Sequence, residues 1–380
     1  MNSRIFLNIV SVCLLLLMSS PPLSAQTSND SSFKTGLQEY FRGNYEAARD
    51  HFQTAVENHP DHTRYRFFLA NTFHRLGEDT HAVGGYRAVL EQDEDHDSAR
   101  ERLANLYYEK QQWSRAIPLY QTLLKGTTND PQIRFRLARS LFEDGQLDRS
   151  QTQFLQVRQQ DPDRARVFYY LGRILLRNDE YLNAGSRFER AIQLDDSPGE
   201  FYFYRALAFF RQEDYLSDNT DGWKSADDFE RAIERGYDDN QTYFMLGNSL
   251  LNRGLYLVRE NRTNRGIDLL KKAIRQYQRV LTGEWKASNA YHNMGVAYLE
   301  IGKLELARKA VEQAILIEPT VAFFHDTLGD IYFRMGEFAR ALDAWQLVGE
   351  LEPEYDGNPF APLRETDPLE DKIQEARVRR

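Results

Sequence analysis

Residues 63–96 read TRYRFFLANTFHRLGEDTHAVGGYRAVLEQDEDH, and they contain two segments with helical spacing. In the first segment, Leu69, Ala70 and Phe73 stand at i, i+1 and i+4, which places them on one face of a helix. In the second segment, Ala82 and Tyr86 stand four residues apart and share a helical face in the same way. The stretch therefore predicts two consecutive helices, each with one apolar face.

This helix pair recurs along the chain with a constant period. Small residues return in steps of 34, in the first helix at Gly36, Ala70, Ala104, Ala138, Gly172 and Ala206, and in the second helix at Ala48, Ala82, Ala116, Ser150 and Ala184. An aromatic ring follows each small residue of the second helix, at Phe52, Tyr86, Tyr120, Phe154 and Phe188. Because one such hairpin cannot bury its apolar face alone, the units are expected to stack on one another.

These patterns resemble the tetratricopeptide repeat (TPR) family. Leu69-Ala70 with Phe73 and Leu328-Gly329 with Tyr332 fit its first-helix signature, and Gly336-x-Phe338 fits its turn. The resemblance implies an all-α, right-handed α-solenoid of about nine helix-turn-helix repeats, spanning residues 29–355. The expected repeats are 29–62, 63–96, 97–130, 131–164, 165–198, 199–239, 240–287, 288–321 and 322–355.

The departures from the family pattern are local. Arg205 stands where the family has a large apolar residue. The family's terminal proline is present at Pro60, Pro162, Pro319 and Pro353 and is replaced at Glu94, Thr128, Asp196, Tyr237 and Trp285. Pro118 falls inside a predicted helix, where a modest kink is expected because proline has no N–H for the helical hydrogen bond.

Two repeats are longer than the rest. The sixth has extra residues in the polar stretch 216–222, and the seventh has them around residues 255–268. In the seventh repeat we expect both helices to lengthen by about two turns, with residues 260–264 as a polar tip. The extension is interpreted either as a neutral insertion or as a spur that contacts a partner or a second subunit.

The two ends leave the repeat pattern. Residues 1–25 have Arg4, an apolar run and Ala25 before a predicted cleavage point, which is typical of a signal peptide; the alternative is an uncleaved membrane anchor. The protein is accordingly predicted to be exported and periplasmic. Residues 356–380 are predicted to be a linker and a C-terminal capping helix, because solenoid ends need a cover over their last apolar stripe.

Composition and motifs argue against several function classes. The chain has 48 Lys+Arg against 57 Asp+Glu, a formal net charge of −9, which disfavours nucleic acid as a partner. Its one cysteine, Cys13, lies in the predicted leader, and no phosphate loop, nucleophile motif or metal-ligand spacing is present. No enzyme activity, cofactor or metal is therefore expected, and the histidines of the first two repeats are interpreted as solvated turn residues.

The resemblance also implies a site, because first helices line a concave groove in TPR proteins. Aromatic rings at these positions predict apolar contact with a ligand, Asn71 and Asn105 predict hydrogen bonds to an extended backbone, and Arg139 and Arg173 predict a carboxylate site. The alternative is that many of the rings merely pack against the neighbouring first helix. The predicted groove residues are Phe67, Asn71, His74, Asn105, Tyr108, Phe135, Arg139, Phe142, Tyr169, Arg173, Phe203, Phe210, Phe244 and Asn248.

The sequence thus favours a non-catalytic scaffold or adaptor that binds a partner protein or peptide in this groove. Envelope assembly, secretion or transport is the expected context, with association with a membrane complex as a further expectation. The alternative function is an accessory protein that binds an apolar small molecule or lipid in the aromatic groove for a membrane transporter.

Overall fold

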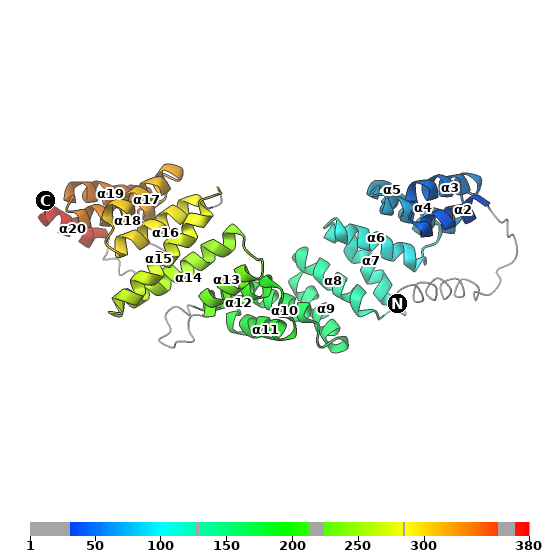
Figure 1. The fold of residues 1–380 in the computed structure, drawn as a ribbon, viewed down its shortest axis with the longest axis horizontal. Helices are drawn as coiled ribbons and strands as arrows, with labels where there is room; N and C mark the ends of the chain where they lie inside the picture. Colours follow the sequence, from blue (N-terminus) through cyan, green and yellow to red (C-terminus); the bar gives the residue numbers. More distant parts are fainter. Residues whose placement is uncertain (1–30, 127–128, 213–223, 284–285, 356–368, 380) are drawn as a thin grey trace. The chain divides into compact units, whose positions relative to one another are not determined.

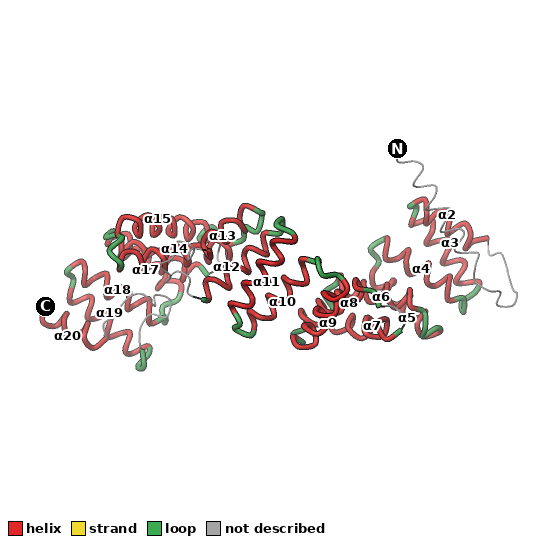
Figure 2. The backbone as a smooth tube through the Cα atoms, turned by 90° about the horizontal axis from the view of Figure 1, so that it is seen from below, coloured by secondary structure: helices red, strands yellow, loops and turns green. Residues whose placement is uncertain are grey.

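The computed structural model describes residues 31–126, 129–212, 224–283, 286–355 and 369–379. The described residues form helices joined by turns and contain no strand (Figures 1 and 2). They divide into two compact units, one up to residue 128 and one from residue 129, and each is described by itself. The all-α fold of helical hairpins that the 34-residue period predicts is confirmed.

The first unit contains three helical hairpins. Consecutive helices pack against each other throughout it. Its helices are α2 (Ser31–Arg42), α3 (Tyr45–Asn58), α4 (Thr63–Arg75), α5 (Asp79–Gln92), α6 (Asp97–Glu109) and α7 (Trp113–Lys125).

The second unit contains six hairpins and a final single helix. Its helices are α8 (Pro131–Glu143), α9 (Leu147–Gln160), α10 (Ala165–Arg177), α11 (Tyr181–Leu194), α12 (Gly199–Arg211), α13 (Lys224–Glu234), α14 (Asn240–Arg259), α15 (Thr263–Val280), α16 (Ala287–Glu300), α17 (Leu304–Ile317), α18 (Ala322–Met335), α19 (Phe338–Leu351) and α20 (Leu369–Arg379). The predicted polar stretch 216–222 of the sixth repeat lies outside the described residues.

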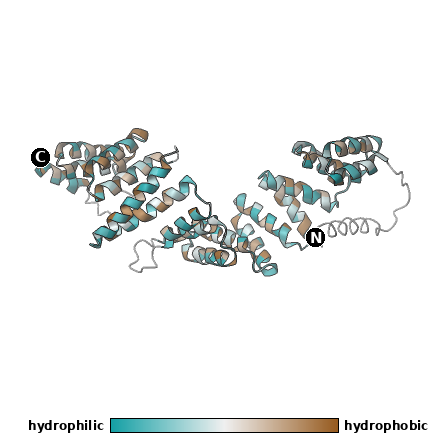
Figure 3. Cartoon of the chain, viewed as in Figure 1, coloured by the Kyte–Doolittle hydropathy of each residue, from teal (hydrophilic) through white to brown (hydrophobic). Residues whose placement is uncertain are grey.

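In several hairpins a ring of the second helix meets a small residue of the first helix, as Phe52, Phe188, Tyr277 and Trp345 do; in the eighth hairpin Val311 takes the place of the ring, opposite Gly295. A Cβ atom added to Gly36 would come within 2.7 Å of the Phe52 ring, and one added to Gly329 within 2.3 Å of Trp345. The rings themselves are buried, and the helices carry both apolar and polar residues (Figure 3). The small residues that repeat in the sequence are therefore the points where the two helices of a hairpin approach most closely.

The seventh hairpin, α14 and α15, is longer than the others. Helix α14 has 20 residues and α15 has 18, whereas α18 and α19 have 14 each. The first helix of this hairpin therefore gains almost two turns, as predicted, but the second gains about one. Gly254 and Gly266 face each other where the helices are extended, and a Cβ on Gly266 would lie 2.8 Å from the Gly254 carbonyl oxygen.

Helix α20 packs against α19 at the end of the second unit. Its Ala376 is fully buried in a cluster with Leu342 and Trp345. The Lys372 ammonium lies 2.7 Å from the Asp326 carboxylate of α18, and only 1% of the Asp326 surface is exposed. The predicted linker, residues 356–368, lies outside the described residues.

The unusual Arg205 is explained by a buried ion pair. Its guanidinium group, on α12, donates two hydrogen bonds to the Asp228 carboxylate on α13, at 2.6 and 2.7 Å, and a third to Glu189 on α11. Arg205 and Asp228 are 7% and 2% exposed. A paired arginine thus fills the place that leucine or methionine has in every other repeat except the first, where it is Thr35.

Candidate functional site

Five of the predicted groove residues lie in the first unit, on α4 and α6. Asn71 is 9% exposed, and its side-chain oxygen accepts a hydrogen bond of 2.8 Å from the Tyr86 hydroxyl of α5. The Asn105 oxygen accepts the same bond, also 2.8 Å, from Tyr120 of α7. Burial raises the pKa of Tyr86, so its hydroxyl stays protonated and remains a donor.

This tyrosine–asparagine pair recurs in the second unit. The Asn248 oxygen of α14 accepts a hydrogen bond of 2.9 Å from Tyr277 of α15 and another of 3.0 Å from the Asn293 amide. Where the second-helix ring is phenylalanine, which has no hydroxyl, the matching first-helix position carries no asparagine; it is Leu37 opposite Phe52 and Arg173 opposite Phe188. The asparagines were predicted to form hydrogen bonds with the backbone of a ligand. For their side-chain oxygens this prediction is wrong, because these oxygens accept hydrogen bonds from buried tyrosine hydroxyl groups.

The other three predicted residues of the first unit are half-buried. Phe67 packs on His96, with ring centroids 5.0 Å apart, and Tyr108 packs edge-on against Trp113 at 5.4 Å. His74 lies with its Nδ1 atom 3.4 Å from the Asp79 carboxylate. These side chains keep part of their surface open, so they stay available to a partner.

Most predicted groove rings of the second unit are closed to a ligand. The packing partners include rings of adjacent helices; for example, Phe142 lies 5.3 Å from Tyr170, and Phe203 lies 5.5 Å from Phe229, measured between centroids. These rings offer little surface to a partner, because rings of the second helix of the same hairpin and of the next first helix pack on them. The buried rings are Phe135, Phe142, Tyr169, Phe203 and Phe244.

Arg173 remains accessible at the surface of α10, above these buried rings. Its guanidinium carbon lies 4.6 Å from the Phe142 ring centroid and 4.8 Å from that of Tyr204 on α12. Arg173, Arg139, Phe210 and Asn248 are all half-buried. These cation–π contacts hold the Arg173 guanidinium group beside the two rings, while part of the side chain stays exposed to an anion.

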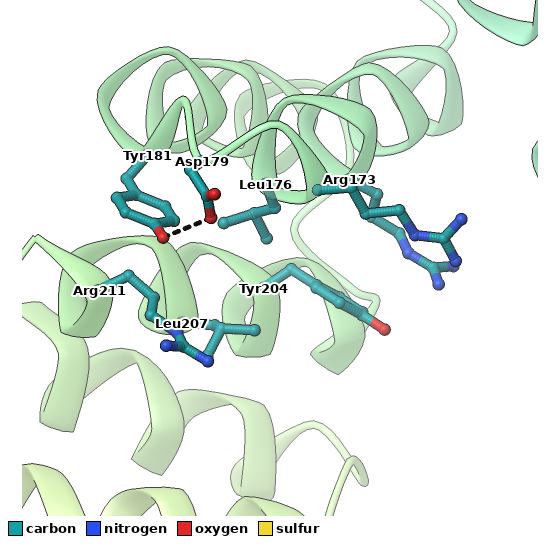
Figure 4. A pocket seen from close by; sticks show the side chains of 8 residues that line it. Arg173, Leu176, Asp179, Tyr181, Tyr204, Leu207 and Arg211 are labelled. Atoms are coloured by element: carbon teal, nitrogen blue, oxygen red, sulfur yellow. Dashed lines mark hydrogen bonds between the residues drawn. The ribbon is translucent and has the colours of Figure 1, made fainter. Parts of the chain in front are cut away.

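A pocket of about 390 Å³ opens beside Arg173 in the second unit. Figure 4 shows Leu176 facing Leu207 and Tyr204 across it, with Arg173 on one side and Arg211 on the other. The pocket lies between α10, the turn that follows it, and α12. Its lining residues are Arg173, Leu176, Arg177, Asp179, Tyr181, Tyr204, Leu207 and Arg211.

The charges of this pocket are unbalanced. The lining has three arginines and one aspartate, and the Asp179 carboxylate accepts a hydrogen bond of 2.6 Å from the Tyr181 hydroxyl. That hydrogen bond raises the pKa of Tyr181. Among the described residues, no carboxylate forms an ion pair with any of the three arginines. In a chain with a formal net charge of −9, this surface is complementary to an anion.

The sequence prediction included Arg173 but missed Arg177, Arg211 and Tyr204. Arg177 and Arg211 stand 34 residues apart, so they occupy the same position of consecutive repeats, one place beyond the last groove position considered. Because two arginines recur at the same repeat position, the sequence could have indicated that both belong to the site. Among the residues that the structure describes, no cluster of histidines, cysteines and carboxylates could hold a metal ion.

The fold and this surface define the class of protein: an all-α solenoid of stacked helical hairpins. Models of the tetratricopeptide repeat match residues 33–97 and 135–197, residues 99–135, and residues 246–316. The chain belongs to the tetratricopeptide repeat family. No curated protein sequence matches it.

Solved structures with similar folds are themselves described as TPR proteins. YrrB, described as "a TPR protein with an unusual peptide-binding site", is 19% identical, covering 53% of this chain and 93% of its own, with a TM-score of 0.43. The C-terminal part of a TPR repeat-containing protein from Cytophaga hutchinsonii is 18% identical over 67% of this chain and 96% of its own, with a TM-score of 0.48. The P58(IPK) TPR domain is 13% identical over 92% and 97%, with a TM-score of 0.29.

No helix within the described ranges combines the length and the apolar character that crossing a membrane requires. The predicted leader, residues 1–25, lies outside those ranges.

Proposed function

We propose that the protein is a non-catalytic adaptor that binds an acidic segment of a partner protein through the arginine-lined pocket of its second unit. The single observation that carries this proposal is the set of three arginines, Arg173, Arg177 and Arg211, which form no ion pair with a carboxylate in the described part of the chain and surround an apolar floor. Binding of proteins or peptides is what TPR domains generally do.

The chemistry of the pocket favours a peptide with both acidic and apolar side chains. The guanidinium groups can each donate two parallel hydrogen bonds to a carboxylate. Leu176 and Leu207 offer apolar contact between them. The alternative function, an apolar ligand held by the aromatic groove, has less support because five of the predicted rings, Phe135, Phe142, Tyr169, Phe203 and Phe244, are buried.

The proposed setting is outside the cytoplasm, in envelope assembly, secretion or transport, with the partner in a membrane complex. Its support is the leader-like sequence of residues 1–25. Fractionation of cells that produce the tagged full chain tests it: recovery in the periplasmic or membrane fraction is expected, and recovery in the cytosol alone would contradict it.

The binding proposal is tested with Arg177→Gln and Arg211→Gln combined in the full chain. The probe is a fluorescein-labelled peptide of alternating glutamate and leucine, and affinity is measured by fluorescence anisotropy. We expect the double variant to bind at least about tenfold more weakly, because a hydrogen bond to a charged group contributes roughly 1.5–3 kcal/mol.

The matched control combines Arg149→Gln with Arg190→Gln, which removes two exposed arginines from α9 and α11 and changes the net charge by the same amount. This control should keep nearly full affinity. A second control peptide carries glutamine in place of glutamate and should bind weakly to every form. Equal loss in both double variants would show that net charge alone attracts the peptide and would contradict the proposed site.

A further inference from the structure

Helix α15 is strongly basic in a chain that is acidic as a whole. Its 18 residues contain five lysines or arginines and one aspartate, whereas the whole chain has a formal net charge of −9. The second helices of the two neighbouring hairpins are not basic, since α13 has two basic and four acidic residues and α17 has two of each. The positive charge is therefore a property of α15 and not of the repeat composition.

The cations lie on the solvent side of this helix. Its apolar residues, such as Leu269, Leu270 and Ala273, are buried in the core of the second unit. At 1.5 Å per residue, the exposed cations are spread over roughly 20 Å of helix. They are Arg265, Lys271, Lys272, Arg275 and Arg279, and Arg262 is exposed in the turn before them.

The described carboxylates neutralise little of this charge. The Lys271 ammonium lies 3.8 Å from the Asp268 carboxylate. In the described part of the chain, no carboxylate forms an ion pair with Lys272 or Arg275. Burial raises the pKa of Glu230 on α13, and the charge of Lys272 opposes that effect, so the acidic α13 bounds the basic surface on one side.

The next second helix, α17, exposes aliphatic side chains. Leu316 is 75% exposed, Ile317 47% and Leu306 42%. Among the described residues six large apolar side chains are exposed, and these are three of them. Thirty-four residues after Leu306 and Leu316 stand Arg340 and Glu350, so the packing of the repeats does not require leucine at these positions.

The cations of α15 and the aliphatic residues of α17 belong to the same side of the second unit. Helix α16 packs against both helices (Figure 1). Tyr277 and Val311, 34 residues apart, each meet the glycine of their own first helix, so the two hairpins have the same register. Lys272 and Leu306 have the same spacing and therefore face the same way. We call these exposed side chains the α15–α17 face.

We propose that the α15–α17 face docks the protein on an anionic lipid bilayer. The lysines and arginines lie among the lipid phosphates, and Leu306, Leu316 and Ile317 reach the boundary with the acyl chains. Clusters of about four to eight basic residues on a helix bind anionic membrane surfaces, and apolar side chains beside them add contact with the acyl region. This face shares no residue with the arginine-lined pocket of α10 and α12, so it adds a second contact to the proposed adaptor.

A bilayer fits this face better than an acidic protein segment does. Small ligands and peptides are usually held in a concavity, whereas a membrane surface needs none. Neither the arginine-lined pocket nor a second pocket, between α5, α6 and α7, includes a residue of α15 or α17. The aliphatic side chains also find an apolar counterpart in the bilayer, which an acidic segment does not supply.

The test is co-sedimentation of the full chain with two kinds of vesicle. One contains equal parts of phosphatidylglycerol and phosphatidylcholine, and the other contains phosphatidylcholine alone. At low salt we expect the partition coefficient to be at least about tenfold higher for the anionic vesicles, and added salt should reduce the difference because it screens the charges. Equal binding to both vesicles, or binding to neither, would overturn the proposal.

Lys272→Gln combined with Arg275→Gln locates the binding. Because each basic residue near an anionic surface contributes roughly fivefold to binding, this variant should bind anionic vesicles at least about tenfold more weakly. Arg149→Gln with Arg190→Gln is the matched control, since it removes the same charge from α9 and α11 and should keep nearly full binding. Equal loss in the two variants would show that net charge alone draws the protein to the vesicles and would rule out the α15–α17 face.

A single variant of α17 separates a bilayer from other polyanions. Leu316→Ser should leave the thermal midpoint unchanged, because the side chain is exposed, and should weaken vesicle binding several-fold. Full vesicle affinity in this variant would show that the leucine does not contact lipid and would assign the face to an acidic protein instead.

The two sites of the second unit are tested independently. The pocket variant Arg177→Gln with Arg211→Gln should bind vesicles as the parent chain does. Lys272→Gln with Arg275→Gln should bind the acidic peptide as the parent chain does. Loss of vesicle binding in the pocket variant would place the lipid contact at the pocket and contradict the α15–α17 face.

Discussion

Asp228→Ala is expected to lower the free energy of unfolding by about 3–5 kcal/mol, because it leaves the Arg205 guanidinium group buried without its main partner. The remaining contact, with Glu189, is half-exposed and cannot replace a pair of hydrogen bonds inside the hairpin. Burial raises the pKa of Asp228, and the hydrogen bonds from Arg205 oppose that effect. The loss is measured by urea unfolding followed by circular dichroism.

The control for this prediction is the double variant Arg205→Met with Asp228→Leu. Replacing both partners with apolar side chains of similar volume leaves no buried charge, and such replacements are often neutral or stabilising. The double variant should therefore recover most of the stability that Asp228→Ala loses. If Asp228→Ala alone unfolds at the same urea concentration as the parent chain, the ion pair does not hold this hairpin.

Trp345→Ala should lower the free energy of unfolding of the last hairpin by about 3–5 kcal/mol, as truncation of a buried aromatic side chain does. Trp345 is 2% exposed, and its indole N–H donates a hydrogen bond of 3.3 Å to the Asp326 carbonyl oxygen. It also contacts Gly329 of α18 and belongs to the cluster that covers Ala376 of α20. Its removal leaves a cavity between three helices.

The measurement is hydrogen exchange of the backbone amides of α18, α19 and α20, because neighbouring hairpins of a repeat protein unfold partly independently. Exchange should accelerate in all three helices. Leu316→Ala, which truncates a side chain 75% exposed on α17, is the control and should change little. Faster exchange confined to α20 would contradict the role of Trp345 in joining α18 to α19.

The sequence was sufficient to predict the hairpins because their contacts are local and repeated. The pairing of Gly172 with Phe188, or of Gly329 with Trp345, depends on spacing within one repeat, and spacing is visible in the sequence. The two-turn extension of α14 was predictable for the same reason. The extension of α15 by only one turn depends on where the tip of the hairpin turns, which the count of inserted residues does not determine.

The candidate site was less predictable because exposure depends on the neighbouring repeat. Phe142 occupies a groove position, but rings of the adjacent helix cover it completely. Arg177 lies one residue beyond the last groove position and yet lines the pocket. The asparagines were misread because their partner, a tyrosine hydroxyl, stands in the other helix of the hairpin.

The placement of these polar contacts has a consequence for how such a chain can evolve by duplication. The Tyr86–Asn71 bond lies inside one hairpin, so a copied or transplanted hairpin carries both halves of the bond with it. Arg205 also reaches Glu189 in the preceding hairpin, and a copy moved elsewhere would leave that acceptor behind. A copy of the sixth hairpin would therefore lose a contact of its buried arginine, whereas a copy of the second would keep its buried hydrogen bond and lose only surface ion pairs such as Asp79 with Lys110.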